Sequence, residues 1–131
     1  MEISTGDRFN EKFLVSDEIY HGFISLFRDR NPLHADENFA KAKGFGSRVM
    51  HGNILGGFLS YFIGECLPVK NVIIHKQEIK YLKPVYLNDA IELEAVVADV
   101  HESVNAIEFK FSFRGQGGQK VARGSIQIGL I

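Results

Sequence analysis

The sequence predicts an α+β fold in which an antiparallel sheet curves around one long helix. In the second half of the chain, apolar and polar residues alternate over 91–97 and 107–113, and a period of two is typical of strands with one buried face. Residues 52–67 are instead apolar on nearly every side of a helical wheel, as expected of a helix that is enclosed by other structure. A run of strands after such a helix indicates an α+β arrangement.

The first half of the chain predicts one strand followed by two short helices. We expect the strand at about 6–14. Ser16 is suited to cap the next helix, because acidic residues and then apolar residues at helical spacing follow it. The second helix is expected within 36–46, where Gly44 or Gly46 ends it.

The chain after the long helix predicts four antiparallel strands, of which the last three form a meander. The strand at 71–82 ends near Pro84, because proline cannot donate to an interior ladder. The segments at 101–105 and 114–120 are the turns between the alternating strands, and the second of them is rich in glycine. The last strand is expected at about 120–130.

Length and charge limit the class of protein. A chain of 131 residues with an apolar fraction of 45% is most simply one domain with a packed core, since single domains commonly contain ~100 to 150 residues. The net charge is −1 and there is no dense run of Lys or Arg, so neither nucleic acid nor a membrane surface is an expected partner. A small molecule or a protein is the better candidate.

The same sequence predicts a location in the cytoplasm. The N-terminus lacks the basic and apolar regions of a signal peptide. Cys66 is the only cysteine, so we interpret it as a core residue in a reducing compartment. The apolar stretch at 54–67 is interrupted by glycines, Ser60 and Glu65, and it is shorter than a membrane span of ~20 residues.

Three stretches carry a resemblance to a known family: DRNPLHADENFA at 29–40, VMHGNILGGFLS at 49–60 and YLKPVYLNDAIEL at 81–93. They strongly resemble the MaoC-like (R)-specific enoyl-CoA hydratases, whose pattern D-x-N-P-x-H-x-D precedes an H-G pair and a central helix. The first two stretches are specific, whereas the Pro-Val passage of the third occurs in many hotdog thioester enzymes. The resemblance implies a single hotdog domain over 1–131. In it, an antiparallel sheet wraps around the helix at about 52–67, and a short helical overhang at about 29–46 carries the active-site loop.

The resemblance implies syn hydration of a trans-2-enoyl thioester to the (R)-3-hydroxyacyl thioester, or the reverse dehydration. By position, Asp29 and His34 are then the catalytic pair. A carboxylate and an imidazole that share one water can deprotonate it as it adds and return a proton to the neighbouring carbon, each step contributing about 10² to 10⁴ in rate. We assign Asp29 as the principal base and His34 as the group that orients the water and acts as acid. No bound cofactor is needed.

Five further residues are expected to bind the thioester or to hold the pair in place. Gly52 matches the glycine whose main-chain N–H faces the thioester oxygen in the family, and a helix N-terminus supplies such a donor. Asn31 and Pro32 are expected to shape the loop, since proline fixes φ and disfavours helix in the residue before it. His51 and Ser60 are interpreted as positioning residues, although a serine bonded to its own helix is an equally good account of Ser60.

Four cations could meet the phosphates of coenzyme A or of the phosphopantetheine arm of an acyl carrier protein: Lys76, Lys80, Lys83 and Arg123. The alternative is that they form only a solvated face. No metal site is expected, because the histidines are scattered and there is no C-x-x-C motif.

Two other functions stay open beside the hydratase. A hotdog thioesterase would commonly carry an acidic residue on the central helix, where Glu65 is the only candidate. A non-catalytic hotdog protein would bind the acyl thioester as a ligand, and Arg28 keeps this alternative open because the family usually has glycine before the aspartate. For any of these functions, a homodimer with joined sheets is expected, since a lone hotdog domain leaves an edge strand and apolar surface unpaired.

Overall fold

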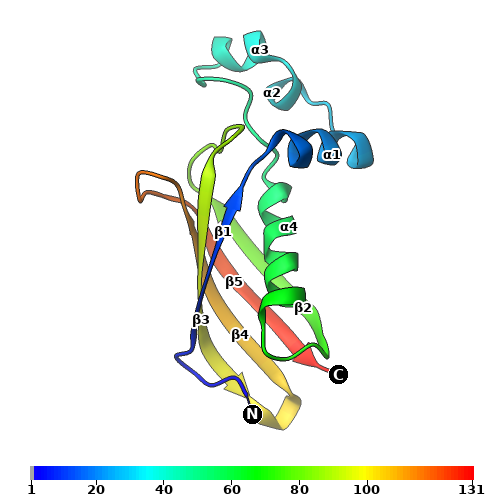
Figure 1. The fold of residues 1–131 in the computed structure, drawn as a ribbon, viewed down its shortest axis with the longest axis vertical. Helices are drawn as coiled ribbons and strands as arrows, with labels where there is room; N and C mark the ends of the chain where they lie inside the picture. Colours follow the sequence, from blue (N-terminus) through cyan, green and yellow to red (C-terminus); the bar gives the residue numbers. More distant parts are fainter. Residues whose placement is uncertain (1) are drawn as a thin grey trace.

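The computed structural model describes residues 2–131 and confirms the α+β architecture. Its sheet contains five antiparallel strands in the order β1-β3-β4-β5-β2. The strands are β1 (Arg8–Leu14), β2 (Val72–Tyr81), β3 (Ala90–His101), β4 (Ala106–Arg114) and β5 (Lys120–Leu130). Every strand expected from the sequence is therefore present (Figure 1), and β1 and β2 form the two edges of the sheet.

The helices occupy two places relative to this sheet. Three short helices, α1 (Asp17–Phe27), α2 (Pro32–Ala35) and α3 (Glu37–Ala42), lie at one end of the sheet, and both termini lie toward the other end (Figure 1). The central helix, α4 (Asn53–Tyr61), runs along the sheet and continues into a π-helical turn, η1 (Phe62–Cys66). A 3₁₀ turn, η2 (Glu102–Val104), joins β3 to β4. No helix within residues 2–131 combines the length and the apolar character that crossing a membrane requires.

Local signals explain where the first helices begin and end. Ser16 caps α1, and its hydroxyl accepts a hydrogen bond from the N–H of Ile19 at 3.2 Å. The cap at the other end of α1 is Arg28, whose φ of 62° is left-handed, a conformation in which helices more often place glycine. Gly44 has a φ of 95° just after α3, which identifies it as the residue that ends the second predicted helix.

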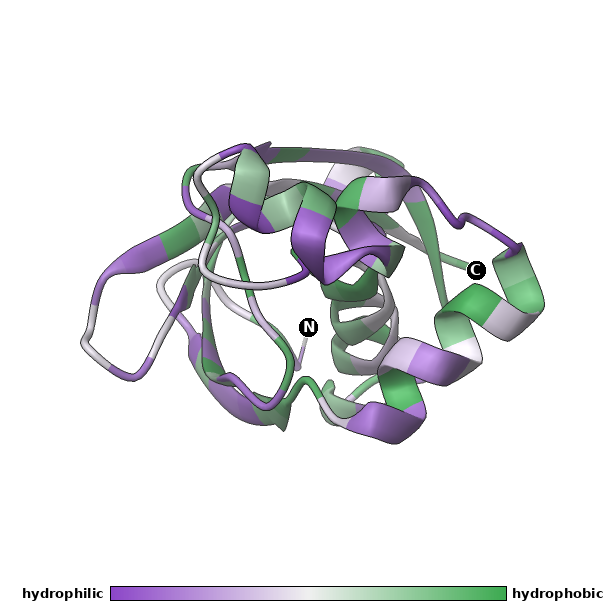
Figure 2. Ribbon diagram, turned by 90° about the horizontal axis from the view of Figure 1, so that it is seen from above, coloured by the Kyte–Doolittle hydropathy of each residue, from purple (hydrophilic) through white to green (hydrophobic). Residues whose placement is uncertain are grey.

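The core lies between α4 and the sheet that curves around it (Figure 2). Phe58 of α4 stacks on Phe13 of β1 with the ring centroids 4.3 Å apart. One turn later, Phe62 meets Phe109 of β4 edge to face at 5.7 Å. Because each buried phenylalanine stabilises the fold by roughly 1.5–3 kcal/mol, the aromatic residues of the alternating strands hold the helix against the sheet.

One side of α4 is uncovered in the single chain. Asn53, Gly57, Ser60 and Gly64 recur at helical spacing and are exposed. The expectation that the whole helix is enclosed is therefore wrong for this side. The physical reason is geometric: the sheet curves around only part of the helix, and α1 lies at its upper end (Figure 1).

Candidate active site

The loop after α1 carries both residues of the expected catalytic pair. Left-handed Arg28 turns the chain out of α1, and Asp29 follows it. Asn31 then caps α2, because its side-chain oxygen accepts from the N–H of Leu33 at 3.0 Å, and Pro32 occupies the first helical position, where a missing N–H costs nothing. The main-chain N–H of Asn31 also donates to Oδ1 of Asp29 at 3.1 Å. Asn31 therefore links the cap of α2 to the carboxylate.

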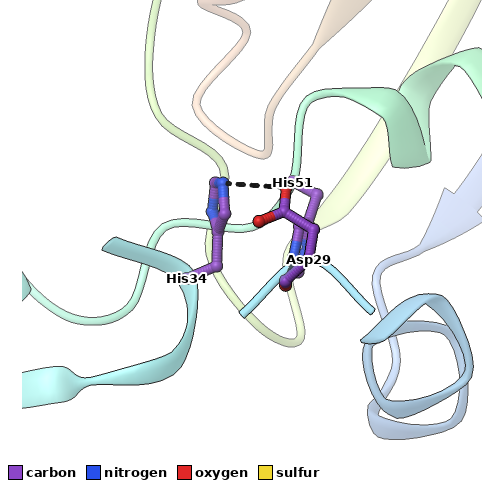
Figure 3. Close-up of side chains that lie close together, drawn as sticks. All are labelled: Asp29, His34 and His51. Atoms are coloured by element: carbon purple, nitrogen blue, oxygen red, sulfur yellow. Dashed lines mark hydrogen bonds and ion pairs between the residues drawn. The ribbon is translucent and has the colours of Figure 1, made fainter. Parts of the chain in front are cut away.

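Asp29 and His34 lie close together at this loop (Figure 3). Oδ2 of Asp29 and Nε2 of His34 are 4.0 Å apart, which is too far for a direct hydrogen bond. Nδ1 of His34 lies 2.7 Å from the main-chain oxygen of Val49. Because a carbonyl only accepts, Nδ1 carries the hydrogen, and Nε2 of the neutral ring is an acceptor. The two acceptors facing each other suit a water molecule that donates one hydrogen bond to each.

Tyr20 supports His34 and was not identified from the sequence. Its hydroxyl donates to the main-chain carbonyl of His34 at 2.5 Å and accepts from Nη1 of Arg48 at 3.3 Å. The Arg48 guanidinium also lies over the Tyr20 ring, 4.9 Å from its centroid. In the sequence, Tyr20 is one more apolar position on an amphipathic helix, so no local signal distinguishes it from an ordinary core residue.

His51 is buried beside the catalytic pair and contacts both of its members. Its Nε2 lies 2.8 Å from the main-chain oxygen of Asp29 and therefore donates to it. Its ring stacks on that of His34, with centroids 4.0 Å apart, and packs on Phe23 at 4.6 Å. Nδ1 of His51 is left as a buried acceptor with no partner within residues 2–131. These contacts place the main chain of Asp29 and the ring of His34.

The site has to be considered as a possible metal site as well. One potential ligand atom from each of Asp29, His34 and His51 lies within 4.8 Å of the others. The two imidazole planes are only 29° apart and are stacked. Because an imidazole binds a metal through an in-plane lone pair, stacked rings do not aim both lone pairs at one point. One nitrogen of each ring also faces a main-chain carbonyl. The arrangement is therefore better suited to positioning than to holding a metal ion.

A cavity of about 520 Å³ brings the pair together with Gly52, the N-cap of α4. The N–H of Gly52 donates to no group within the described residues 2–131. A free N–H at the positive end of a helix dipole suits an oxygen that gains negative charge. Much of the remaining wall is apolar and includes Met50 and Leu55, so the cavity combines a few polar groups with space for a hydrophobic substrate.

The other residues expected at the site lie in different places. Lys83 lines the same cavity as the catalytic pair. Lys80 and Arg123 are direct neighbours across β2 and β5, and they line a second depression over the strands. Lys76 forms an ion pair with a glutamate on its own strand at 3.3 Å. Ser60 is exposed on the uncovered side of α4 and does not line the cavity.

Cys66 is partly buried at the end of the central helix. Burial raises the pKa of its thiol from 9.0 to about 11, and a hydrogen bond with Glu11 adds to the shift. The thiol therefore stays protonated near neutral pH, which disfavours it as a nucleophile.

Comparison with known proteins identifies the class to which this site belongs. The family model described as "MaoC like domain" matches residues 8–112. The chain therefore belongs to the MaoC-like domain family, as the motifs around Asp29 and Gly52 led us to expect.

Individual relatives agree with this assignment. The chain is 30% identical over 100 residues to a 3-hydroxybutyryl-CoA dehydratase of Methylorubrum extorquens, a match that covers 76% of this chain and 62% of that protein. It is 27% identical over 130 residues to an (R)-specific enoyl-CoA hydratase of Aeromonas caviae, with 99% and 96% of the two chains covered. The solved structure of the (R)-hydratase from A. caviae superposes with a TM-score of 0.90 at 26% identity, over 98% of each chain. The fold is the hotdog fold.

Proposed function

We propose that this protein is an (R)-specific enoyl-thioester hydratase, which adds water reversibly to a trans-2-enoyl-CoA to form the (R)-3-hydroxyacyl-CoA. The observation that carries the proposal is that Asp29 and His34 share one cavity with the unpaired N–H of Gly52. The relative from M. extorquens is named a dehydratase and the relative from A. caviae a hydratase, and these names describe the two directions of one reaction.

The reaction begins with a water molecule bound between Asp29 and His34. Both side chains accept a hydrogen bond from it, so its oxygen lone pair is free to attack the β-carbon of the enoyl group. The carboxylate of Asp29 takes a proton as the new C–O bond forms, and the electrons of the double bond move toward the thioester carbonyl. The Asp29 carboxyl then gives this proton to the α-carbon, so the reaction consumes one water and releases no proton. In this mechanism His34 orients the water, and Asp29 is the acid in place of the expected His34, because Nδ1 of His34 donates to Val49 and its Nε2 is an acceptor.

Negative charge develops on the thioester oxygen during this addition. The N–H of Gly52 is the donor that stabilises it, since it is free and lies at the N-terminus of α4. A preorganised donor of this kind typically contributes about 10² to 10³ in kcat. No bound cofactor takes part, because the thioester itself activates the double bond.

The carrier of the acyl group is coenzyme A or the phosphopantetheine arm of an acyl carrier protein. Lys83 is the cation best placed to meet a phosphate, because it lines the cavity that contains Asp29. Lys80 and Arg123 line a different depression, so a carrier bound in the cavity contacts them only if it extends beyond the cavity. A reducing compartment such as the cytoplasm fits the single unpaired Cys66.

Hydration of crotonyl-CoA tests the proposed function. The purified protein should consume the conjugated thioester and form (R)-3-hydroxybutyryl-CoA, measured by absorbance and by chiral chromatography. Asp29→Asn and His34→Ala should each lower kcat by about 10² or more. Asp36→Asn is the matched control, because Asp36 caps α3 through Phe39 and lies outside the cavity, and it should retain activity.

Other outcomes would point to a different function. Release of free thiol from the thioester would indicate a thioesterase, with Glu65 as the acidic residue of the central helix. Tight binding of crotonyl-CoA without any reaction would indicate a non-catalytic binding protein. Absence of turnover with short, medium and long enoyl chains, on CoA and on carrier protein alike, would overturn the hydratase proposal.

A second copy of the chain is the protein partner that fits best. β2 is an edge strand with Ile73 48% exposed, and an open strand edge favours pairing with another strand. The uncovered side of α4, which includes Gly57 and Ser60, gives a second surface of small side chains. Pairing two β2 strands would join the sheets of a homodimer.

Light scattering after size-exclusion chromatography tests this assembly. The wild-type protein should have the mass of a dimer, and Ile73→Lys should shift it toward the monomer. Val104→Lys is the control, because Val104 is 68% exposed on η2 and does not belong to an edge strand. A wild-type monomer at all concentrations would contradict the dimer.

A further inference from the structure

Tyr81 is the last residue of β2 and faces the core side of the sheet. Its partner across the strands is Ala122 of β5, which in turn pairs with Phe113 of β4. Ala122 and Phe113 are both fully buried. Because side chains on one row of a sheet share a face, Tyr81 lies on the side of the sheet where α4 packs.

The ring of Tyr81 lies against Gly52. A Cβ added to Gly52 would come within 2.8 Å of Cε1 and 2.9 Å of Cζ of Tyr81. Cζ carries the phenolic oxygen. The end of the ring that bears the hydroxyl group is therefore next to Gly52, and the end attached to Cβ is farther away. The absence of a side chain at position 52 is therefore what allows the tyrosine to approach the start of α4 so closely.

The hydroxyl of Tyr81 is an unused donor in the wall of the active-site cavity. Tyr81 lines the same cavity as Asp29, His34 and Gly52. Within residues 2–131 its hydroxyl forms no hydrogen bond, and the side chain is 48% exposed, so a ligand can reach it. Burial of part of the ring raises the pKa of the phenol, which keeps its proton in place at neutral pH.

We propose that the Tyr81 hydroxyl is a second donor to the thioester carbonyl oxygen, beside the N–H of Gly52. This inference rests on the proposed function and adds a catalytic residue to it. As water adds to the β-carbon, the electron pair of the double bond moves onto the carbonyl oxygen, where Tyr81 and Gly52 each donate a hydrogen bond. Tyr81 keeps its proton throughout, so the overall reaction is unchanged.

The Tyr81→Phe variant tests the proposal because it removes only the oxygen and keeps the ring against Gly52. We expect kcat for crotonyl-CoA to fall about 10²-fold with little change in KM, since the bond strengthens as charge develops. Tyr86→Phe is the matched control. The Tyr86 hydroxyl accepts from the N–H of Gly46 at 3.3 Å and lies outside the cavity lining, so its loss should leave kcat unchanged.

A spectroscopic measurement separates this role from a structural one. In the Asp29→Asn background, isotope-edited infrared difference spectra give the carbonyl stretching frequency of bound crotonyl-CoA. Adding Tyr81→Phe should raise this frequency toward its value in water, and adding Tyr86→Phe should not. An unchanged frequency with Tyr81→Phe would overturn the proposal even if kcat falls. If the wild-type protein does not turn over but the frequency still depends on Tyr81, the hydratase function fails while the hydrogen bond stands.

Discussion

The imidazole of His51 lies face to face with that of His34, with the ring centroids 4.0 Å apart, while its Nε2 donates to the main-chain carbonyl of Asp29 at 2.8 Å. One buried side chain therefore holds both members of the proposed catalytic pair, one by stacking and the other by a hydrogen bond. Its remaining nitrogen has no partner within residues 2–131. The stacking on His34 and the hydrogen bond to Asp29 use different parts of the side chain, so a substitution can remove one and keep the other.

Replacing His51 by phenylalanine should reduce activity more than stability. The His51→Phe variant keeps a ring against His34 and Phe23 and removes the unpaired buried nitrogen, but it loses the bond to Asp29. Because small misplacements of a catalytic group are costly, we expect kcat to fall about 10-fold to 100-fold, with little change in Tm. His51→Gln can keep the donor and should recover part of kcat. Equal kcat in wild type and His51→Phe would contradict a positioning role.

Removing the Tyr20 hydroxyl should destabilise the protein. Tyr20→Phe leaves the carbonyl of His34 without its donor, and an unpaired polar group in the protein interior costs about 1–3 kcal/mol. Urea denaturation should report this loss in the free energy of unfolding. Tyr61→Phe is the control, because Tyr61 is 52% exposed, and it should have almost no effect.

Glycine in place of Arg28 should stabilise the fold. Arg28 has a φ of 62° at the end of α1, and a left-handed conformation costs a residue with a side chain roughly 1–2 kcal/mol. Part of this gain is lost to the greater freedom of glycine in the unfolded chain, so we expect a net increase of about 0.5–1 kcal/mol in the free energy of unfolding. Arg30→Gly, at a residue without positive φ, should not increase Tm. A lower Tm for Arg28→Gly would show that the arginine contributes a stabilising contact.

Adding a methyl group at Gly52 should impair turnover. The Cβ of a Gly52→Ala variant would overlap the Tyr81 ring at 2.8 Å, so the ring or the start of α4 has to move. We expect kcat to fall about 10²-fold, since both donors to the carbonyl oxygen are displaced. Gly56→Ala is the control on the same helix, because the nearest atom to its added Cβ, Nε2 of Gln77, is 3.7 Å away, which is an ordinary contact. Steady-state kinetics on crotonyl-CoA gives the comparison.

Alkylation of Cys66 should be slow and should increase steeply at alkaline pH. Only the thiolate reacts, and burial raises the pKa of the folded thiol from 9.0 to about 11. The unfolded chain therefore loses this proton at lower pH than the folded chain, so stability from this group is present below pH 9.0 and decreases as the pH approaches 11. Iodoacetamide labelling followed by mass spectrometry should show much slower reaction in buffer than in denaturant. Equal rates at pH 8 would contradict the shift.

Much of the fold could be predicted because its signals are local. Ser16 caps the helix that follows it, Gly44 ends the second helix, and the alternating phenylalanines of β4 face α4. The separation of Asp29 from His34 across Asn-Pro also pointed to a bent loop. The uncovered side of α4 could not be predicted in this way, because hydropathy reports which residues avoid water and does not report how far a sheet reaches around a helix.

The sequence by itself determined the strands along the chain, the helices apart from the short α2, the family, and the candidate pair Asp29 and His34, because periodicity, capping residues and motif spacing are written along the chain. Only the tertiary structure decided what surrounds that pair. Tyr20 reaches His34, and Tyr81 reaches Gly52, through contacts between segments that are distant in sequence. The same packing placed Lys83 in the cavity and Lys80 and Arg123 in another depression. Such contacts depend on the register of the strands and the position of α4, which no single segment encodes.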